Sequence, residues 1–258
     1  MALKGFLLCA HGSLFVLLPA YVMFLLVRRV PNLDRTLIWW GAGGFLVATF
    51  PQNFFTILSR EVLDAASVCY TAVAKLVVAA LLAGLFLEGV KYLVLRYRRV
   101  GGEALVPSGV AVGLGAGLMN QIFQGFVLVG IGFRLLFGDI SSPLAAERAA
   151  SSISALGLAA VDSLLSRLSW LIVSACLGAL IARAILVSKK SLLLEAMLLH
   201  AGIELIARAI ALSLQGRGFL ATLLALAFDC VLLAVGWAWL NRQLPQAVGA
   251  LTHKKRRK

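Results

Sequence analysis

Charged residues are scarce in this chain of 258 residues. They make up 14% of it, whereas hydrophobic residues make up 61%. A typical soluble domain is about 25% charged and about 45–50% apolar. The composition therefore excludes a soluble globular protein, a disordered chain and a collagen-like fibre. The mean hydropathy of +0.97 is instead typical of a polytopic membrane protein.

Residues that commonly bind metals are also few, with four cysteines and three histidines. The cysteines, Cys9, Cys69, Cys176 and Cys230, form no CxxC or other metal-ligand spacing. All lie in or beside apolar runs, where a free cysteine acts as a small hydrophobe. A Cys9–Cys69 disulfide is an alternative to free thiols, because both residues fall near the same membrane face in the topology below.

No polar stretch is long enough to fold as a water-facing domain. A net charge of +13 would indicate a nucleic-acid partner only if such a domain existed. We therefore expect no nucleic-acid partner and expect the lipid bilayer as the surroundings. The basic excess then sets the orientation of the chain in the membrane.

Seven stretches have the roughly 20 mainly apolar residues that a membrane span requires. The sequence predicts an all-α bundle of seven transmembrane helices in one domain, 1–241, with a basic tail, 242–258. A short interfacial turn or helix is predicted after Pro143, over 144–152. The first run is too long for a signal peptide and precedes Arg28–Arg29, so we interpret it as a retained helix. The predicted spans are 6–27, 36–58, 69–95, 106–137, 151–187, 191–213 and 218–240.

Lysine and arginine outside the predicted spans favour one membrane face by 15 to 5. The positive-inside rule then places the N-terminus outside and the C-terminus in the cytoplasm. The basic residues at the end of the tail (254–258) are interpreted as a topology anchor, with binding to anionic lipid as the alternative. The richer face holds Arg28, Arg29, Arg35, Arg96, Arg98, Arg99, Arg183, Lys189, Lys190, Arg242 and the tail, and the other holds Lys4, Arg60, Arg134, Arg148 and Arg217.

Charged residues within the predicted spans are close to balanced in sign. Such residues are costly in a bilayer and tend to pair inside the bundle, so we expect internal ion pairs. The pattern leaves open which pairs form and whether they only hold helices together. The cations are Lys75, Lys91, Arg167 and Arg208, and the anions are Glu88, Asp162, Glu204 and Asp229, with Glu195 nearer a helix end.

Two predicted helices carry polar side chains at helical spacing. Glu88 and Lys91 are three residues apart and share one face of the third span. His200, Glu204 and Arg208 lie at i, i+4 and i+8 and form one polar stripe on the sixth span. Glu204 would either orient His200, as in a metal site, or pair with Arg208.

The fourth predicted span is rich in glycine. Gly109, Gly113 and Gly117 recur every four residues, which lets a neighbouring helix approach closely. No strand precedes this segment, so it does not match a nucleotide-binding loop. Asn120 and Gln124 share a face and would hydrogen-bond to another helix or line a site. By rise per residue, Glu88, His200, Ala116 and Ser174 lie at roughly similar depths, so four helices would meet there.

These segments resemble YhfC-type intramembrane metalloproteases, relatives of the PrsW and CAAX-processing proteases. The anterior-pharynx-defective subunit of γ-secretase is a non-catalytic relative. The resemblance covers about half of the chain, from Gly84 to Arg208, and implies a prokaryotic plasma-membrane protein. Leu87-Glu88-Gly89-Val90-Lys91-Tyr92 matches a motif that begins with two glutamates, one of which is missing here. His200 and Glu204 match a motif of His followed four residues later by Asp or Asn.

The other two motifs depart further from the family pattern. In the Gly-rich segment from Gly113 to Asn120, Ala116 and Asn120 stand where ionisable groups are expected. Ser166-Arg167 and Ser174 stand where the family has a Glu-Arg pair and then a His. A catalytic zinc usually takes three protein ligands and a water, so the metal site would be incomplete.

The resemblance implies roles for the residues that are retained. Glu88 would be the general base or a ligand, His200 a metal ligand, and Glu204 a ligand or an orienting partner of His200. Asn120 would stabilise an oxyanion, and Lys91 and Arg208 would support the site. Zinc is one expectation for this site, and the absence of a cofactor is the favoured one.

Three functions therefore stay open. The favoured one is a catalytically degenerate homologue that acts as a membrane scaffold or binds a membrane-protein partner. The first alternative is an active metal-dependent intramembrane peptidase that uses Glu88, His200 and Glu204. The second is a transporter or channel component that uses the buried charges as a pathway.

Overall fold

The structure is a computed structural model that describes residues 1–29, 33–65, 71–98, 104–213 and 218–255. These residues are helical apart from short turns, which confirms the all-α prediction. They form eight helices: α1 (Ala2–Arg29), α2 (Thr36–Ala65), α3 (Thr71–Tyr97), α4 (Leu105–Leu136), α5 (Pro143–Ala150), α6 (Ile153–Leu186), α7 (Lys190–Ser213) and α8 (Gly218–Lys255).

The short helix expected after Pro143 is present as α5. Ser142 caps its N-terminus, because the Ser142 hydroxyl accepts a hydrogen bond from the Ala145 backbone amide at 3.1 Å. Pro143 occupies the first turn, where the missing amide proton costs no intrahelical bond. At the other end of the chain, α8 continues as one helix through Lys255, into the segment predicted as a basic tail.

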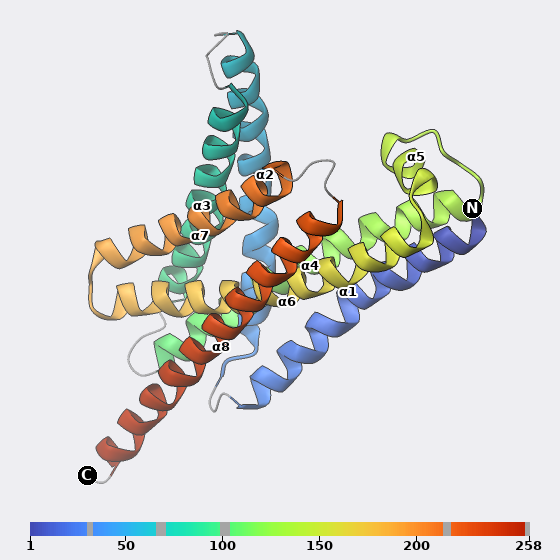
Figure 1. The fold of residues 1–258 in the computed structure, drawn as a ribbon. Coiled ribbons are helices and arrows are strands. Elements are labelled where there is room, and N and C mark those ends of the chain that lie inside the picture. Colours follow the sequence, from blue (N-terminus) through green and yellow to red (C-terminus); the bar gives the residue numbers. More distant parts are fainter. Residues whose placement is uncertain (30–32, 66–70, 99–103, 214–217, 256–258) are drawn as a thin grey trace.

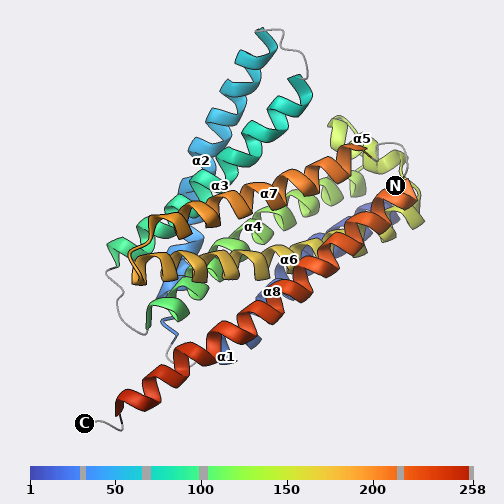
Figure 2. The same cartoon turned by 60° about the vertical axis from the view of Figure 1, so that its left-hand side comes forward.

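Four long helices, α1, α4, α6 and α8, run side by side (Figures 1 and 2). Helices α2 and α3 lie side by side and extend away from this bundle at the end of α2 and the start of α3, while they pack against α4 and α7 nearer their other ends. Basic residues lie at or near the C-terminal ends of α1, α3, α6 and α8. These four ends lie on one side of the molecule, toward the lower left of Figure 1. The N-terminus and the α4–α5 region lie on the opposite side.

Five of the described helices are long and apolar enough to cross a membrane, not the seven that the sequence predicted. They are α1, α3, α4, α6 and α8. Helix α2 is long enough, but Pro51, Gln52 and Asn53 lower its apolarity. In α7 the stripe of His200, Glu204 and Arg208 does the same. The described chain is thus a multi-pass membrane protein in which polar residues set α2 and α7 apart.

Glycines in α4 bring three helices into backbone contact. A Cβ atom at Gly113 would lie 2.1 Å from the Ser174 carbonyl oxygen of α6, and one at Gly115 would lie 1.9 Å from that of Ile38 in α2. Both distances are far below van der Waals contact, so neither position tolerates a side chain. The packing interpretation of the glycine stripe is therefore confirmed.

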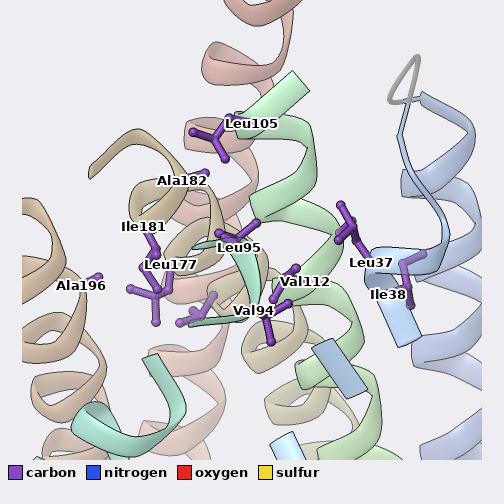
Figure 3. Packing of buried hydrophobic residues seen from close by; sticks show 12 residues of the cluster. Leu37, Ile38, Val94, Leu95, Leu105, Val112, Leu177, Ile181, Ala182 and Ala196 are labelled. Carbon is purple, nitrogen blue, oxygen red and sulfur yellow. The ribbon is translucent and has the colours of Figure 1, made fainter. Parts of the chain in front are cut away.

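Apolar side chains fill the bundle at the end where the basic residues gather. Leu37 and Ile38 of α2, Leu95 of α3, and Leu177 and Ile181 of α6 belong to one buried cluster (Figure 3). We call this cluster the basic-end core. Because it joins α2, α3, α4, α6 and α7, it leaves little room for solvent at this end of the bundle.

Candidate functional site

A cavity of about 480 Å³ lies between five helices, α2, α3, α4, α6 and α7. Leu177, a member of the basic-end core, lies in its wall, so the core closes the cavity on that side. The lining is polar for a membrane protein and includes carboxamides, hydroxyls and charged groups. A volume of this size suits a small molecule or a lipid head group.

Most of the residues that carry the family resemblance line this one cavity. Lys91 of α3, Asn120 of α4, and His200, Glu204 and Arg208 of α7 all do so. The motif-matching residues without ionisable groups, Ala116 and Ser174, are there as well. The expectation that four helices meet at one level agrees with this placement.

Glu88 lies behind the cavity wall rather than in it. Its side chain has no exposed surface, and its Oε1 atom accepts a hydrogen bond from the Lys91 ammonium at 2.8 Å. The same oxygen lies 2.7 Å from His200 Nδ1 on α7. A carboxylate oxygen can only accept, so Nδ1 carries the proton and donates. Glu88 thus holds Lys91 and His200 in place at the cavity from behind.

Gly84 makes this contact between α3 and α7 geometrically possible. A Cβ atom at Gly84 would lie 2.3 Å from the carbonyl oxygen of Met197. Gly84 is four residues before Glu88, and Met197 is three residues before His200. A side chain at position 84 would therefore force apart the two helix segments that bring Glu88 and His200 together.

Glu204 pairs with Arg208 and not with His200. Its Oε1 atom accepts from Arg208 Nε at 2.7 Å and from Nη2 at 2.5 Å, within one turn of α7. Of the two roles that the spacing left open for Glu204, the structure shows the ion pair. The carboxylate that orients His200 is Glu88, from a different helix.

Exposure rises along α7 away from the basic-end core. The exposed fraction of the side chain is 8% for His200, 22% for Glu204 and 36% for Arg208. Phe123 and Gln124 of α4 also line the cavity and are not fully buried. The cavity is thus closed beside Glu88 and opens toward Arg208.

Helix α2 contributes polar groups that sequence reasoning did not single out. Thr49, Gln52 and Asn53 line the cavity. The only sequence signal was the polar run Pro51-Gln52-Asn53 inside an otherwise apolar segment. This run alone does not reveal which neighbouring helix it faces.

A second group of polar residues lies behind the wall, between α6 and α8. Asp229 of α8 accepts a hydrogen bond from the Ser169 hydroxyl at 2.8 Å, and both residues are buried. Arg167 of α6 lines the cavity, and its charge interacts with those of Asp229 and Glu204. No ion pair within 4 Å joins Arg167 to either acid in the described residues, so the pairing expected within the spans is only partial there.

The remaining charges and cysteines lie elsewhere. Lys75 pairs with Asp64 near the end of α2 and the start of α3, and Glu195 is exposed. His11 lies beside α6, where its Nε2 atom is 2.8 Å from the Ser163 hydroxyl. Cys9 is a free thiol in the described structure, whereas Cys69 lies outside the described residues.

The side chains present do not fit a zinc ion. In the described part of the chain, no group of three or more His, Cys, Asp or Glu residues is placed to hold a metal. Glu88 Oε1 is occupied by two donors, and Glu204 Oε1 by one arginine. The Lys91 ammonium in the same wall would also repel a cation. A catalytic zinc needs about three protein ligands. His200 Nε2 and Glu88 Oε2 have no hydrogen-bond partner in the described residues, but they do not belong to a group of three possible ligands there.

Comparison with known proteins identifies no relative of this chain. No protein-family model, no curated protein and no solved structure matches the chain.

Proposed function

We propose that this chain is a multi-pass membrane protein that binds a ligand or a membrane partner in its cavity without cleaving it. In this proposal it is a catalytically degenerate relative of the YhfC-type proteases, in the plasma membrane of a prokaryote. The observation that carries the proposal is the cavity itself. Residues of all four motifs meet there, while both carboxylates at motif positions are held by cations.

The chemistry of the carboxylates argues against peptide hydrolysis. Hydrolysis by a zinc enzyme needs a metal-bound water and a carboxylate that takes up its proton. Glu88 is fully buried, and its Oε1 atom accepts from Lys91 and His200. Glu204 lies beside a guanidinium, which disfavours taking up a proton. The site is therefore better suited to binding than to catalysis.

Metal analysis of the detergent-purified protein tests this proposal. We expect well below one zinc ion per chain and no cleavage of membrane peptide substrates. His200→Ala and Glu88→Gln should leave the metal content unchanged. About one zinc ion per chain that is lost in both variants, together with peptide cleavage, would show an active peptidase instead.

A transporter is the second candidate, and the asymmetry of the cavity favours it. The cavity is open beside Arg208 and closed by the basic-end core beside Glu88. A transporter exposes its site to one side of the membrane at a time, near the middle of the bilayer. Reconstitution into liposomes tests this candidate, because movement of a solute that depends on Lys91 and Arg167 would support it.

The partners in this proposal follow from the cavity and the tail. A membrane-protein segment would enter from the open side, near Arg208. The basic residues from Lys254 to Lys258 would bind anionic lipid at the membrane surface. Vesicle binding with and without residues 254–258 tests the lipid interaction.

A further inference from the structure

The charges that face the cavity differ in sign from those behind its wall. Lys91, Arg167 and Arg208 line the cavity, and Glu204 is the acid that lines it. Glu88 and Asp229 are buried outside the lining. The described lining therefore presents three cations and one acid. Lys91 and Arg208 are each paired with an acid, which leaves Arg167 as the lining cation that has no ion-pair partner within 4 Å in the described residues.

The Arg167 guanidinium has N–H donors that are not used in hydrogen bonds within the described residues. In the described residues it makes no hydrogen bond, and its Nε atom is both buried and without a partner. The Phe15 ring lies 5.3 Å from the guanidinium carbon, a contact that gives its N–H groups no hydrogen-bond acceptor. A guanidinium has five N–H donors in a planar fork that matches the oxygens of a carboxylate or phosphate.

Gln121 of α4 is an independent sign of a missing partner. Its side chain is fully buried and lines the cavity, yet neither its amide nitrogen nor its amide oxygen has a hydrogen-bond partner in the described structure. Buried polar groups are nearly always hydrogen-bonded, because an unsatisfied one destabilises the fold. A ligand that accepts a hydrogen bond would satisfy the nitrogen of the Gln121 amide.

The one acid in the lining is largely neutralised. Two nitrogen atoms of Arg208 contact Glu204 Oε1. Lys91 pairs with Glu88, which is not part of the cavity lining. An anion in the cavity would thus meet Arg167 and Lys91 without facing a free carboxylate.

We propose that the cavity binds an oxyanion group, the carboxylate or phosphate of a small molecule or of a lipid, between the Arg167 guanidinium and the Gln121 amide. The inference rests on the proposed function, since it takes the cavity to be a binding site. It adds the class of ligand and the two residues that recognise it. Hydrogen bonds to a charged group inside a low-dielectric site are strong, so both residues matter for affinity.

Tryptophan fluorescence offers a direct measurement of binding. Trp170 lines the cavity, and its ring lies 5.4 Å from that of His200. The protein in neutral phosphatidylcholine nanodiscs is titrated with sodium phosphate and with sodium acetate at constant ionic strength. A parallel sample contains phosphatidic acid in the nanodisc. Saturable quenching that disappears in Trp170→Phe is expected for at least one of these three probes.

The variants separate recognition from unspecific charge effects. Arg167→Gln is expected to weaken binding by about tenfold or more, since it removes a charged donor. Gln121→Leu should also weaken binding and keeps the proposal testable if the arginine variant does not fold. Arg134→Gln is the matched control, because Arg134 lies outside the cavity near Asp139 and is half exposed. Its affinity should equal that of the wild type.

The three probes also distinguish the source of the oxyanion. Saturation by phosphate or acetate indicates a soluble ligand, and a response to phosphatidic acid alone indicates a lipid. No saturable response to any probe overturns the proposal, as does equal weakening by Arg134→Gln and Arg167→Gln. Zinc-dependent peptide cleavage would contradict the proposed function, but it would not change the result of the oxyanion titration. Failure of the proposed function and failure of the oxyanion proposal are therefore distinguishable.

Discussion

Two ionic groups on neighbouring turns of α7 differ in how they are built. His200 joins Glu88 and Lys91 from α3, and these side chains are almost completely buried. Glu204 and Arg208 pair within α7 and are partly exposed. The first group ties two helices together, whereas the second faces the open part of the cavity. Glu88 and Glu204 are the same residue type but differ in burial and in whether the partner lies on the same helix. These two differences therefore decide how much each glutamate contributes to holding the helices together.

The largest effect is expected from removing the charge of Glu88. Glu88→Gln leaves the Lys91 ammonium buried without its counter-ion. Breaking a buried pair in this way costs about 3–5 kcal/mol of unfolding free energy. Unfolding in mixed micelles of mild detergent and SDS, followed by circular dichroism, measures the loss.

A double variant sharpens this result. Glu88→Gln with Lys91→Met removes the unpaired charge, so we expect most of the lost stability to return. If Glu88→Gln unfolds at the same SDS fraction as the wild type, Glu88 does not tie α3 to α7 as described.

Gly84→Ala is expected to separate α3 from α7 near the buried group. The new Cβ would meet the Met197 carbonyl oxygen at 2.3 Å, and overpacking of this kind costs about 1–3 kcal/mol. Gly202→Ala on α7 is the matched control, because nothing lies within 4 Å of a Cβ there. That variant should keep or raise stability, since alanine favours a helix more than glycine. Thermal unfolding in detergent compares the two, and equal melting temperatures would contradict the close contact.

Removing the charge of Glu204 is expected to have a smaller effect on stability. The Glu204–Arg208 pair is partly exposed and lies within one helix, so Glu204→Gln should cost less than about 1 kcal/mol. The same SDS unfolding measurement applies. A loss as large as that of Glu88→Gln would show that the two ionic groups do not differ as described.

The smallest effect is expected outside the membrane-spanning segments, at the start of α2. Hydrogen bonds from the Thr36 hydroxyl and backbone amide lower the pKa of the Asp34 carboxyl. A lowered folded-state pKa stabilises the fold above the ordinary pKa of aspartate, about 3.9. This contribution is lost as the pH falls through the lowered value.

Hydrogen exchange of the first turn of α2 checks this pH dependence. Wild type and Asp34→Asn are compared at the same pH, so that the intrinsic exchange rates cancel. The wild type should be more protected than the variant at pH 6, and the difference should shrink near pH 3. A difference that grows on acidification would contradict the sign of the pKa shift.

Much of the local structure was predictable because helix geometry is periodic. Three-residue and four-residue spacing placed Glu88 with Lys91, and His200, Glu204 and Arg208 on one face of α7. Long apolar runs predicted most helix bounds within a few residues, but α2 and α8 continue past the predicted ends, to Ala65 and Lys255. The sequence overestimated the number of spans, because α2 and α7 carry polar residues, and several of these line the cavity. The sequence left open whether Glu204 pairs with His200 or with Arg208.

Only the packing of the helices decided which partners meet across the bundle. Glu88 and His200 are 112 residues apart, and their contact depends on the close approach of α3 and α7 at Gly84. Helix packing also decided three other features of the site. It placed Glu88 behind the cavity wall, brought polar groups of α2 into the lining and left the Gln121 amide without a partner in the described residues. A spacing rule describes the faces of one helix. Contacts between helices depend on how all the helices pack, because the excluded volume of the whole bundle decides which helix faces touch.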